Sequence, residues 1–130
     1  MEKTECYGVD LDGTLAEYHD WKGPTNIGKA IPKMLNKVKG WIEEGIRVVI
    51  FTARADDPDT IPAIVEWLEE NGIGGLDITN IKTSDISRIY DDRAIQVKRN
   101  DGTILGDESL MIEWTVVSDS ITKLYEIYNK

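Results

Sequence analysis

The chain has 130 residues, 41% of them hydrophobic, and 24 acidic against 15 basic side chains give it a net charge of −9. This length suits one domain with a single core, and the hydrophobic content is ordinary for a globular protein and excludes disorder as the default. The acidic balance opposes sequence-independent binding to nucleic acid, which depends on Lys and Arg neutralising phosphates. We therefore predict a single globular domain over residues 1–130.

The chain has one cysteine, Cys6, which excludes a scaffold of intrachain disulfides. Its first residues lack the apolar stretch of a secretory signal. No apolar run approaches the 18 residues or so that a membrane helix needs. The sequence predicts a cytoplasmic protein with no membrane partner.

Short β-rich runs alternate with helical patterns along the first half of the chain. Residues 5–9 are expected to form the first strand. Apolar side chains recur at helical spacing from Ile31 to Ile42, and Gly45 is a typical residue for a helix end. The β-branched run 47–52 predicts a strand that is covered on both faces.

The same alternation continues in the second half. Asp59 or Thr60 is expected to cap a second helix, which has Pro62 in its first turn and ends at Asn71 and Gly72. The remaining predicted elements are strands over 77–81 and 88–91, a hairpin of 94–98 with 103–105, and an amphipathic helix over 110–128.

Alternating strands and helices predict crossover connections and a mainly parallel sheet. Ligands of such sheets bind beyond the carboxyl ends of the strands. Polar side chains that follow the predicted strands are therefore expected to meet at one edge. They are Asp10 and Asp12 after the first strand, Thr52 and Arg54 after the second, Lys82 after the third, and Asp91 with Asp92 after the fourth.

The acidic members of this group indicate a metal site. Asp10 and Asp12, with Asp91 or Asp92, offer oxygen ligands only, and such ligands favour Mg²⁺. One carboxylate of the first pair is placed to attack the phosphorus of a bound phosphoryl group and form an aspartyl-phosphate. The other carboxylate, two residues away, is placed to protonate the leaving oxygen and later to deprotonate a water.

The other polar members suit a phosphorylated substrate. Thr52 offers a hydroxyl and neighbouring backbone N–H groups to phosphoryl oxygens, and Lys82 offers a positive charge that balances the transition state. The Arg54 guanidinium has the fork geometry to bind a second phosphate or a carboxylate of the substrate. Each of the three also has a structural interpretation, as a strand end, a surface lysine or a local ion pair.

These residues, in this order, resemble the haloacid dehalogenase superfamily over about residues 5 to 98. The resemblance implies a three-layer Rossmann-like α/β fold with a mainly parallel sheet, in which Asp10 is the nucleophile and Asp12 the general acid and base. The matching pieces are the Asp-x-Asp-Gly-Thr-Leu box at 10–15, the hydrophobic run ending in Thr52, the lysine Lys82, and the pair Asp91-Asp92.

The resemblance also implies a set of metal ligands. Members of the superfamily bind Mg²⁺ through the side chain of the first aspartate, the backbone carbonyl of the second and an acidic residue of the last motif. Those positions correspond here to Asp10, Asp12 and one of the last pair, of which we choose Asp92 as the direct ligand and Asp91 as its neighbour. Members that act as dehalogenases generally lack an acid at the second position, so Asp12 favours phosphate transfer.

The insert before the first predicted helix is only a short flap, Ala16 to Gly23, and no long insert follows the second strand. The chain therefore resembles the superfamily members that have no cap domain. Such an open site suits a bulky phosphorylated substrate, or closure by another subunit. The roles of Tyr18, His19 and Trp21 in the flap stay open, as does the oligomeric state.

The predicted function is a Mg²⁺-dependent phosphohydrolase that acts through Asp10 on a phosphomonoester of unknown identity. The runs 52–54 (Thr-Ala-Arg) and 91–93 (Asp-Asp-Arg) are also similar to the phosphatase half of phage polynucleotide kinase. A nucleotide or polynucleotide 3′-phosphatase is therefore an alternative, which the net charge weakens. An alternative of another class is a phospho-accepting, receiver-like signalling domain, which uses the same residue types in a different order along the chain.

Overall fold

The computed structural model of the chain describes residues 5–106. Its contacts divide the chain into two compact units, with the boundary between Asp92 and Arg93. The helix predicted over 110–128 lies outside the described residues. Within 5–106, no helix has the length and apolar character needed to cross a membrane.

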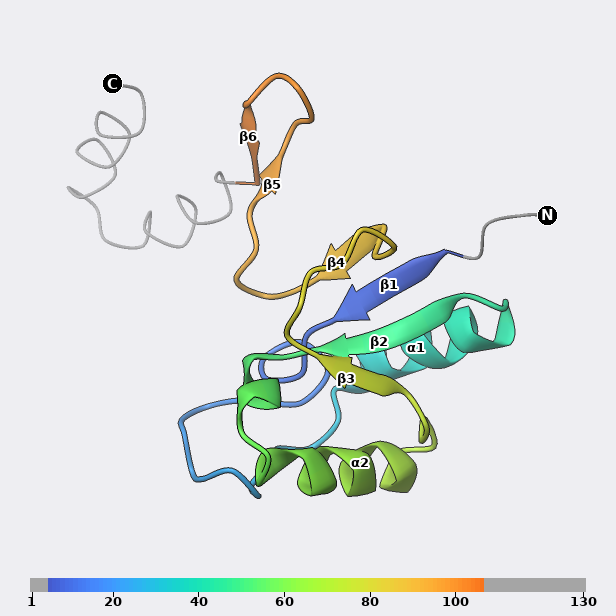
Figure 1. Cartoon of the computed structure of the whole chain (residues 1–130), viewed down its shortest axis with the longest axis vertical. Helices are drawn as coiled ribbons and strands as arrows, with labels where there is room; N and C mark the ends of the chain where they lie inside the picture. The colour runs from blue at the N-terminus through green and yellow to red at the C-terminus, as the bar shows by residue number, and fades with distance from the viewer. Residues whose placement is uncertain (1–4, 107–130) are drawn as a thin grey trace. The chain divides into compact units, whose positions relative to one another are not determined.

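The first unit is built on a four-stranded sheet in which every neighbouring pair is parallel. All four strands therefore end at the same edge, as the arrowheads in Figure 1 show. Their spatial order is β3 (Asp77–Thr79), β2 (Arg47–Phe51), β1 (Cys6–Val9) and β4 (Arg88–Tyr90), with α1 (Pro32–Glu43) and α2 (Thr60–Glu70) in the first two crossovers. This confirms the predicted α/β class with a parallel, Rossmann-like sheet.

The helix ends follow from local chemistry, with one exception. Pro32 occupies the first turn of α1, where its fixed φ suits a helix, and Gly45 follows the helix at a φ of 86°. The expected side-chain cap of α2 is wrong, because Asp59 precedes the helix without a cap hydrogen bond. The Thr60 hydroxyl instead donates to backbone carbonyl oxygens that precede it.

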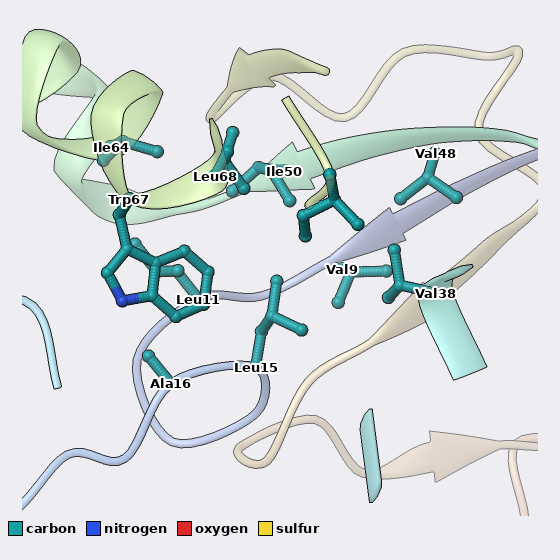
Figure 2. Packing of buried hydrophobic residues seen from close by; sticks show 11 residues of the cluster. Val9, Leu11, Leu15, Ala16, Val38, Val48, Ile50, Ile64, Trp67 and Leu68 are labelled. Carbon is teal, nitrogen blue, oxygen red and sulfur yellow. The ribbon is translucent and has the colours of Figure 1, made fainter. Parts of the chain in front are cut away.

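Both helices pack on one face of the sheet. Figure 2 shows Val38 of α1 and Leu68 of α2 packed around Val9 and Ile50 of the central strands. The register of β1 and β2 pairs Val9 with Ile50, and paired residues of neighbouring strands face the same side of the sheet.

The loop after β1 is anchored in the same core. Leu11 and Leu15 are fully buried members of the cluster in Figure 2. They flank the aspartate, glycine and threonine of the first motif, Asp12 to Thr14. Burial of two leucines on this scale stabilises the loop by several kcal/mol, roughly 1.5–3 kcal/mol for each side chain. The polar residues between them are therefore held on a rigid support.

A loop, residues 80–87, crosses the other face of the sheet from β3 to β4. A Cβ atom at Gly8 of β1 would lie 3.4 Å from Cγ2 of Ile86, so the loop passes close to the sheet at that glycine. Within 5–106, no α-helix covers this face. The third layer of the expected fold is thus not part of the described residues.

The segment 17–29, which we call the flap loop, is longer than the expected flap of 16–23. Ala16 forms an antiparallel bridge with Ala30 at its base. The Trp67 indole N–H donates to the Gly28 carbonyl oxygen at 2.8 Å, which ties the loop to α2. A Cβ atom at Gly28 would overlap the opposite backbone, so only glycine fits this crossing.

The second unit contains the expected hairpin, of which β5 (Gln96–Val97) and β6 (Ile104–Leu105) pair antiparallel. Its turn contains two residues with positive φ, Asn100 at 61° and Gly102 at 89°. Asparagine and glycine tolerate this left-handed backbone best. The prediction of a hairpin is confirmed, with strands shorter than expected.

Candidate active site

β1 and β4 bring Asp10 and Asp91 to the same point of the sheet edge. The register pairs Val9 with Tyr90, the last residues of the two strands. The Asp10 backbone N–H then donates to the Tyr90 carbonyl oxygen at 2.9 Å. Asp10 and Asp91 therefore leave the sheet side by side, although 80 residues of chain separate them in the sequence.

Three carboxylates meet at this point. One oxygen from each of Asp10, Asp91 and Asp92 lies within 4.8 Å of the other two. Mg²⁺ holds oxygen ligands at about 2.0–2.1 Å in an octahedron, so its ligands lie roughly 3–4 Å apart. The donor set is all oxygen and its spread is close to that of an octahedral shell. These three side chains fit a magnesium ion.

Thr14 links two of these acids. Its Oγ1 lies 3.3 Å from Oδ2 of Asp10 and 3.2 Å from Oδ1 of Asp92, within reach of a hydrogen bond to either. The same oxygen accepts the backbone N–H of Asp92 at 2.9 Å. Sequence reasoning assigned Thr14 no role, although its place in the first motif was the available signal.

Gly13 leaves room for one of the acids. Its φ is 88°, and a Cβ atom there would lie 2.5 Å from Oδ2 of Asp92. Glycine suits this position for two reasons: its backbone adopts the positive φ, and it leaves room for the Asp92 carboxylate.

Asp10 lies in an environment that disfavours its charge. The side chain is only 8% exposed. Burial raises the pKa of Asp10 to about 7, and the negative charges of Asp91 and Asp92 add to the effect, while the Thr14 hydroxyl opposes it. A cation bound beside Asp10 would favour the carboxylate again.

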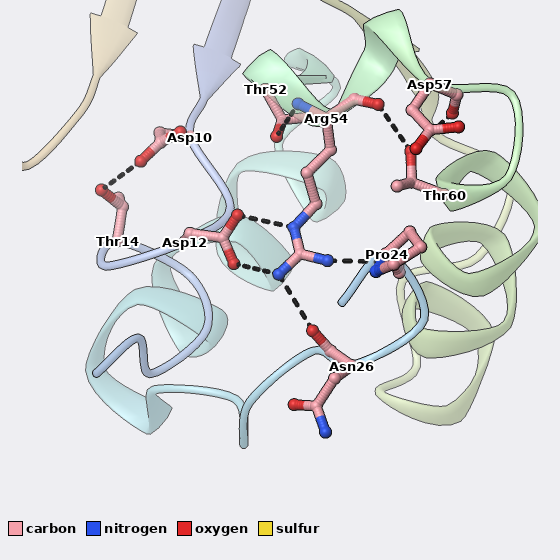
Figure 3. Close-up of polar contacts among 9 residues, drawn as sticks. All are labelled: Asp10, Asp12, Thr14, Pro24, Asn26, Thr52, Arg54, Asp57 and Thr60. Carbon is pink, nitrogen blue, oxygen red and sulfur yellow. Dashed lines mark hydrogen bonds and ion pairs between the residues drawn. The ribbon is translucent and has the colours of Figure 1, made fainter. Parts of the chain in front are cut away.

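Asp12 does not join this cluster through its side chain. Figure 3 shows its carboxylate in a two-pronged ion pair with Arg54. Nε donates to Oδ2 at 2.7 Å and Nη2 donates to Oδ1 at 2.9 Å. Asp12 is one of the predicted metal ligands, and with its carboxylate paired to Arg54 only its backbone carbonyl oxygen is available to a metal ion.

The backbone around Arg54 is fixed from both sides. β2 is followed by a short 3₁₀ helix, η1 (Ala53–Asp56), which the sequence did not predict. The Arg54 backbone N–H donates to Oγ1 of Thr52 at 3.2 Å, and the Thr60 hydroxyl donates to the Arg54 carbonyl oxygen at 2.5 Å. Thr52 is itself buried. Its hydroxyl oxygen serves as the N-terminal cap of η1, in addition to any role toward a substrate.

The Arg54 side chain also contacts the flap loop. Nη1 donates to the Pro24 carbonyl oxygen at 3.3 Å, and Nη2 donates to that of Asn26 at 2.9 Å. The Trp21 ring lies on the guanidinium, with its centroid 4.8 Å from Cζ. With these contacts and Asp12, Arg54 is only 7% exposed. The fork expected to bind a substrate anion is engaged by the protein's own carboxylate.

A pocket of about 200 Å³ lies beside this ion pair. Asp12 and Arg54 line it together with flap-loop residues, including Tyr18, His19, Lys22 and Lys29. Its lining carries charges of both signs. Any group bound there lies next to Asp12.

Lys82 lies in loop 80–87, which starts at the same edge of the sheet, and its side chain is exposed. Within the part of the chain that the structure describes, no hydrogen bond or ion pair fixes its position. Its predicted role toward a phosphoryl group stays a prediction.

Comparison with known proteins adds information on the fold alone. No protein-family model matches the sequence, and no curated protein matches it. A solved structure, described as that of the conserved protein coded by a locus from Bacteroides thetaiotaomicron, has a similar fold with a TM-score of 0.55. The two sequences are 20% identical, and the match covers 94% of this chain and 98% of the other. The similarity supports the α/β fold.

Proposed function

We propose that this protein is a Mg²⁺-dependent phosphohydrolase that cleaves a phosphomonoester through an aspartyl-phosphate on Asp10. The observation that carries the proposal is the meeting of Asp10, Asp91 and Asp92 at the carboxyl edge of a parallel sheet, with oxygens within 4.8 Å of one another. Three acids at that edge, one of them buried, are a costly arrangement for the apoprotein. A divalent cation offsets that cost.

The side chains of Asp10 and Asp92 would hold the ion directly, with Asp91 beside them and the Asp12 carbonyl as a further oxygen ligand. When bound, Mg²⁺ neutralises charge on the phosphoryl oxygens and favours the ionised form of Asp10. It thereby allows an anion to enter an acidic site.

The reaction follows from the two aspartates of the first motif. The Asp10 carboxylate attacks phosphorus, and the bond from phosphorus to the ester oxygen breaks. For this step Asp12 has to leave its pair with Arg54 and take up a proton from solvent. It then gives this proton to the ester oxygen, so the leaving group departs as an alcohol. Asp12 then takes a proton from water, which attacks the phosphorus, releases inorganic phosphate and restores Asp10.

Two further residues would bind the phosphoryl group. Thr52 lies at the end of β2 and offers a hydroxyl proton, because its oxygen already accepts the Arg54 N–H. Lys82, in the loop after β3, brings an exposed positive charge. Positive groups of this kind stabilise the charge that develops in the transition state.

We infer a small phosphorylated compound as the substrate. The net charge of −9 disfavours a polynucleotide, although 3′-phosphorylated ends remain the alternative suggested by sequence. The single buried thiol, Cys6, suits the reducing cytosol.

The experiment is a phosphatase assay with p-nitrophenyl phosphate and a panel of phosphorylated metabolites, nucleotides and 3′-phosphorylated oligonucleotides. Many turnovers with Mg²⁺ and none with EDTA are expected. Asp10→Asn and Asp12→Asn should abolish turnover, whereas the matched variant Asp85→Asn, an exposed partner of Arg47, should not. Equal rates in wild type and Asp10→Asn would refute the mechanism.

The same assay separates a hydrolase from a receiver-like domain. A receiver accepts one phosphoryl group per molecule from a small phosphodonor and keeps it. Release of many phosphates per protein therefore excludes a stoichiometric acceptor, and a single stable phosphorylation would exclude the hydrolase.

A further inference from the structure

We propose that the buried guanidinium of Arg54 is a binding site for a carboxylate of the substrate, and that Asp12 fills this site while the substrate is absent. A substrate whose leaving group carries a carboxylate takes the place of Asp12 and frees it. The inference rests on the proposed function for its catalytic consequence, and on the geometry for the exchange of one carboxylate for another. It names the class of substrate as phosphomonoesters of hydroxy acids.

The Arg54 guanidinium is fixed by contacts that do not involve Asp12. Nη1 donates to the Pro24 carbonyl oxygen at 3.3 Å, and Nη2 donates to that of Asn26 at 2.9 Å. The Trp21 ring lies on the guanidinium, with its centroid 4.8 Å from Cζ. These partners are uncharged, and they hold the guanidinium in place whether or not Asp12 is paired with it. A fork that is fixed before its partner arrives binds a carboxylate at a lower entropic cost.

Asp12 occupies the edge of the guanidinium that these contacts leave free. Its oxygens accept from Nε at 2.7 Å and from Nη2 at 2.9 Å, in the two-pronged geometry of an arginine–carboxylate pair. A carboxylate of a ligand makes the same two hydrogen bonds once Asp12 has moved away. The chemical group that fits the fork is therefore the one that already fills it.

The charge of Arg54 couples the departure of Asp12 to the arrival of another anion. The Arg54 side chain is 5% exposed and the Asp12 side chain 21%, so the carboxylate is the more exposed partner. The proposed reaction requires Asp12 to leave the pair, yet a buried guanidinium without an anion is strongly destabilised. Within residues 5–106, no other carboxylate is paired with Arg54. A carboxylate on the substrate removes this obstacle, because it keeps Arg54 paired after Asp12 has left.

The pocket of about 200 Å³ gives such a group access to Arg54, because both members of the ion pair line it. The charges of its acidic and basic side chains balance, with Asp12, Glu17 and Asp20 against Lys22, Lys29 and Arg54. A carboxylate therefore meets no excess of negative charge there, in contrast to the net charge of −9 of the whole chain. A leaving group that lies beside Asp12 in this pocket also lies beside Arg54.

The first test measures the exchange without any reaction. Glycerate, a hydroxy acid, is titrated into the protein without metal, and NMR follows the Arg54 Nε–H signal, with glycerol as the uncharged counterpart. Glycerate should shift this signal in wild type, and it should bind about 10-fold or more tightly to Asp12→Ala, in which no carboxylate has to be displaced. Glycerol should shift the signal in neither protein. Equal affinity for glycerate in the two proteins, or no shift in either, would overturn the proposal.

Asp85→Ala is the matched control for the loss of one negative charge, because Asp85 is also paired with an arginine, Arg47, at 2.8 Å. Its affinity for glycerate should equal that of wild type. A gain as large as in Asp12→Ala would replace the proposal by a general effect of net charge. Should Asp12→Ala not fold, Asp12→Asn keeps an acceptor oxygen for Arg54 without the charge. That variant must then bind glycerate more tightly than wild type, or the proposal is wrong.

The second test measures specificity as kcat/KM. We compare 2-phosphoglycerate with glycerol 2-phosphate, and 3-phosphoglycerate with glycerol 3-phosphate, since the members of each pair differ by a carboxylate in place of a hydroxymethyl group. Wild type should prefer the carboxylate ester of at least one pair by about 10-fold or more. Arg54→Lys, which keeps the charge and loses the fork, should reduce this preference to about twofold.

The two tests separate failure of this inference from failure of the proposed function. No preference in an active wild type, or the same preference in Arg54→Lys, would overturn the assignment of Arg54 to a substrate carboxylate and leave the phosphohydrolase intact. If wild type hydrolyses no phosphoester at all, the proposed function fails. The glycerate titration then decides on the exchange at Arg54 by itself.

Discussion

The carboxylate of Asp92 occupies the space that a side chain on Gly13 would fill. Oδ2 of Asp92 lies 2.5 Å from the Cβ position of an alanine at residue 13. The glycine of the first motif and the acid of the last one are thus complementary in shape. Glycine at this turn therefore leaves room for the Asp92 carboxylate and also suits the positive φ of the backbone.

Gly13→Ala should therefore weaken Mg²⁺ binding and destabilise the fold. The matched control is Gly45→Ala, since Gly45 has nearly the same φ, 86°, and no atom within 4 Å of the added methyl. Both variants are expected to lose about 1 kcal/mol of unfolding free energy from backbone strain. Only Gly13→Ala should bind Mg²⁺ at least 10-fold more weakly in a calorimetric titration. Equal affinity in the two variants would show that the Asp92 position does not depend on Gly13.

Removal of single carboxylates should identify the direct ligand. Asp92→Asn is expected to lower Mg²⁺ affinity by about 100-fold or more, and Asp91→Asn by about 10-fold, as for a residue that supports a ligand. In wild type, Mg²⁺ at 100 times its dissociation constant should add about 2.7 kcal/mol to stability. Thermal unfolding with and without Mg²⁺ measures this gain. The reverse order of the two variants would make Asp91 the direct ligand.

The raised pKa of Asp10 predicts a pH dependence in the protein without metal. The folded state holds the Asp10 proton up to about pH 7, whereas the unfolded chain releases it near pH 4. The unfolding free energy should therefore fall as pH rises from 4 to 7, and the loss should be complete above 7. Asp10→Asn removes this loss and should exceed wild type in stability by roughly 2–4 kcal/mol at pH 8, with no difference near pH 4.

Urea denaturation in EDTA at several pH values measures this effect. Asp85→Asn is the control, because the Thr83 hydroxyl lowers the pKa of Asp85 and Arg47 stabilises its charge. That variant should not gain stability at high pH. A gain of similar size in both variants would point to the overall negative charge rather than to burial at Asp10.

Lys82→Ala tests the predicted site residue for which the described part of the chain, residues 5–106, supplies no hydrogen bond or ion pair. If Lys82 reaches the phosphoryl group in the transition state, kcat should fall about 100-fold with little change in unfolding free energy. Lys98→Ala, in the turn region of the second unit, serves as a control for the loss of one surface charge. A kcat within twofold of wild type would remove Lys82 from the site.

Much of the fold could be predicted from the sequence because a parallel sheet leaves a strong local pattern. The run 48–51 is apolar throughout, in keeping with the burial of Val48, Val49 and Ile50 in β2, and Gly45 marks the end of α1. The rule that polar residues gather at the carboxyl edge correctly grouped Asp10 with Asp91 and Asp92. Each of these signals depends on a few neighbouring residues.

The pairings that the sequence did not reveal depend on contacts between distant segments. Arg54 meets Asp12 over 42 positions, through a 3₁₀ turn that has no periodic signal. The true extent of the flap loop is set by the bridge between Ala16 and Ala30, and the hydrogen bond from Trp67 to Gly28 ties the loop to α2. A tryptophan at helical spacing predicts a core residue, and Trp67 is one. The hydrogen bond from its ring N–H to the Gly28 carbonyl oxygen could not be predicted, because the sequence does not show that the two residues meet.

Among residues 5–106, β4 lies at the edge of the sheet and pairs only with β1, yet both acids of the last motif follow it directly. Thr14 and Asp92 stand 78 positions apart and meet only through that pairing. A folding intermediate in which β4 has not yet paired with β1 would therefore have Asp10 in place without Asp91 and Asp92 beside it. Affinity for a divalent cation should thus appear late in folding, once β4 has paired with β1. Cation binding would then report that the whole sheet has formed.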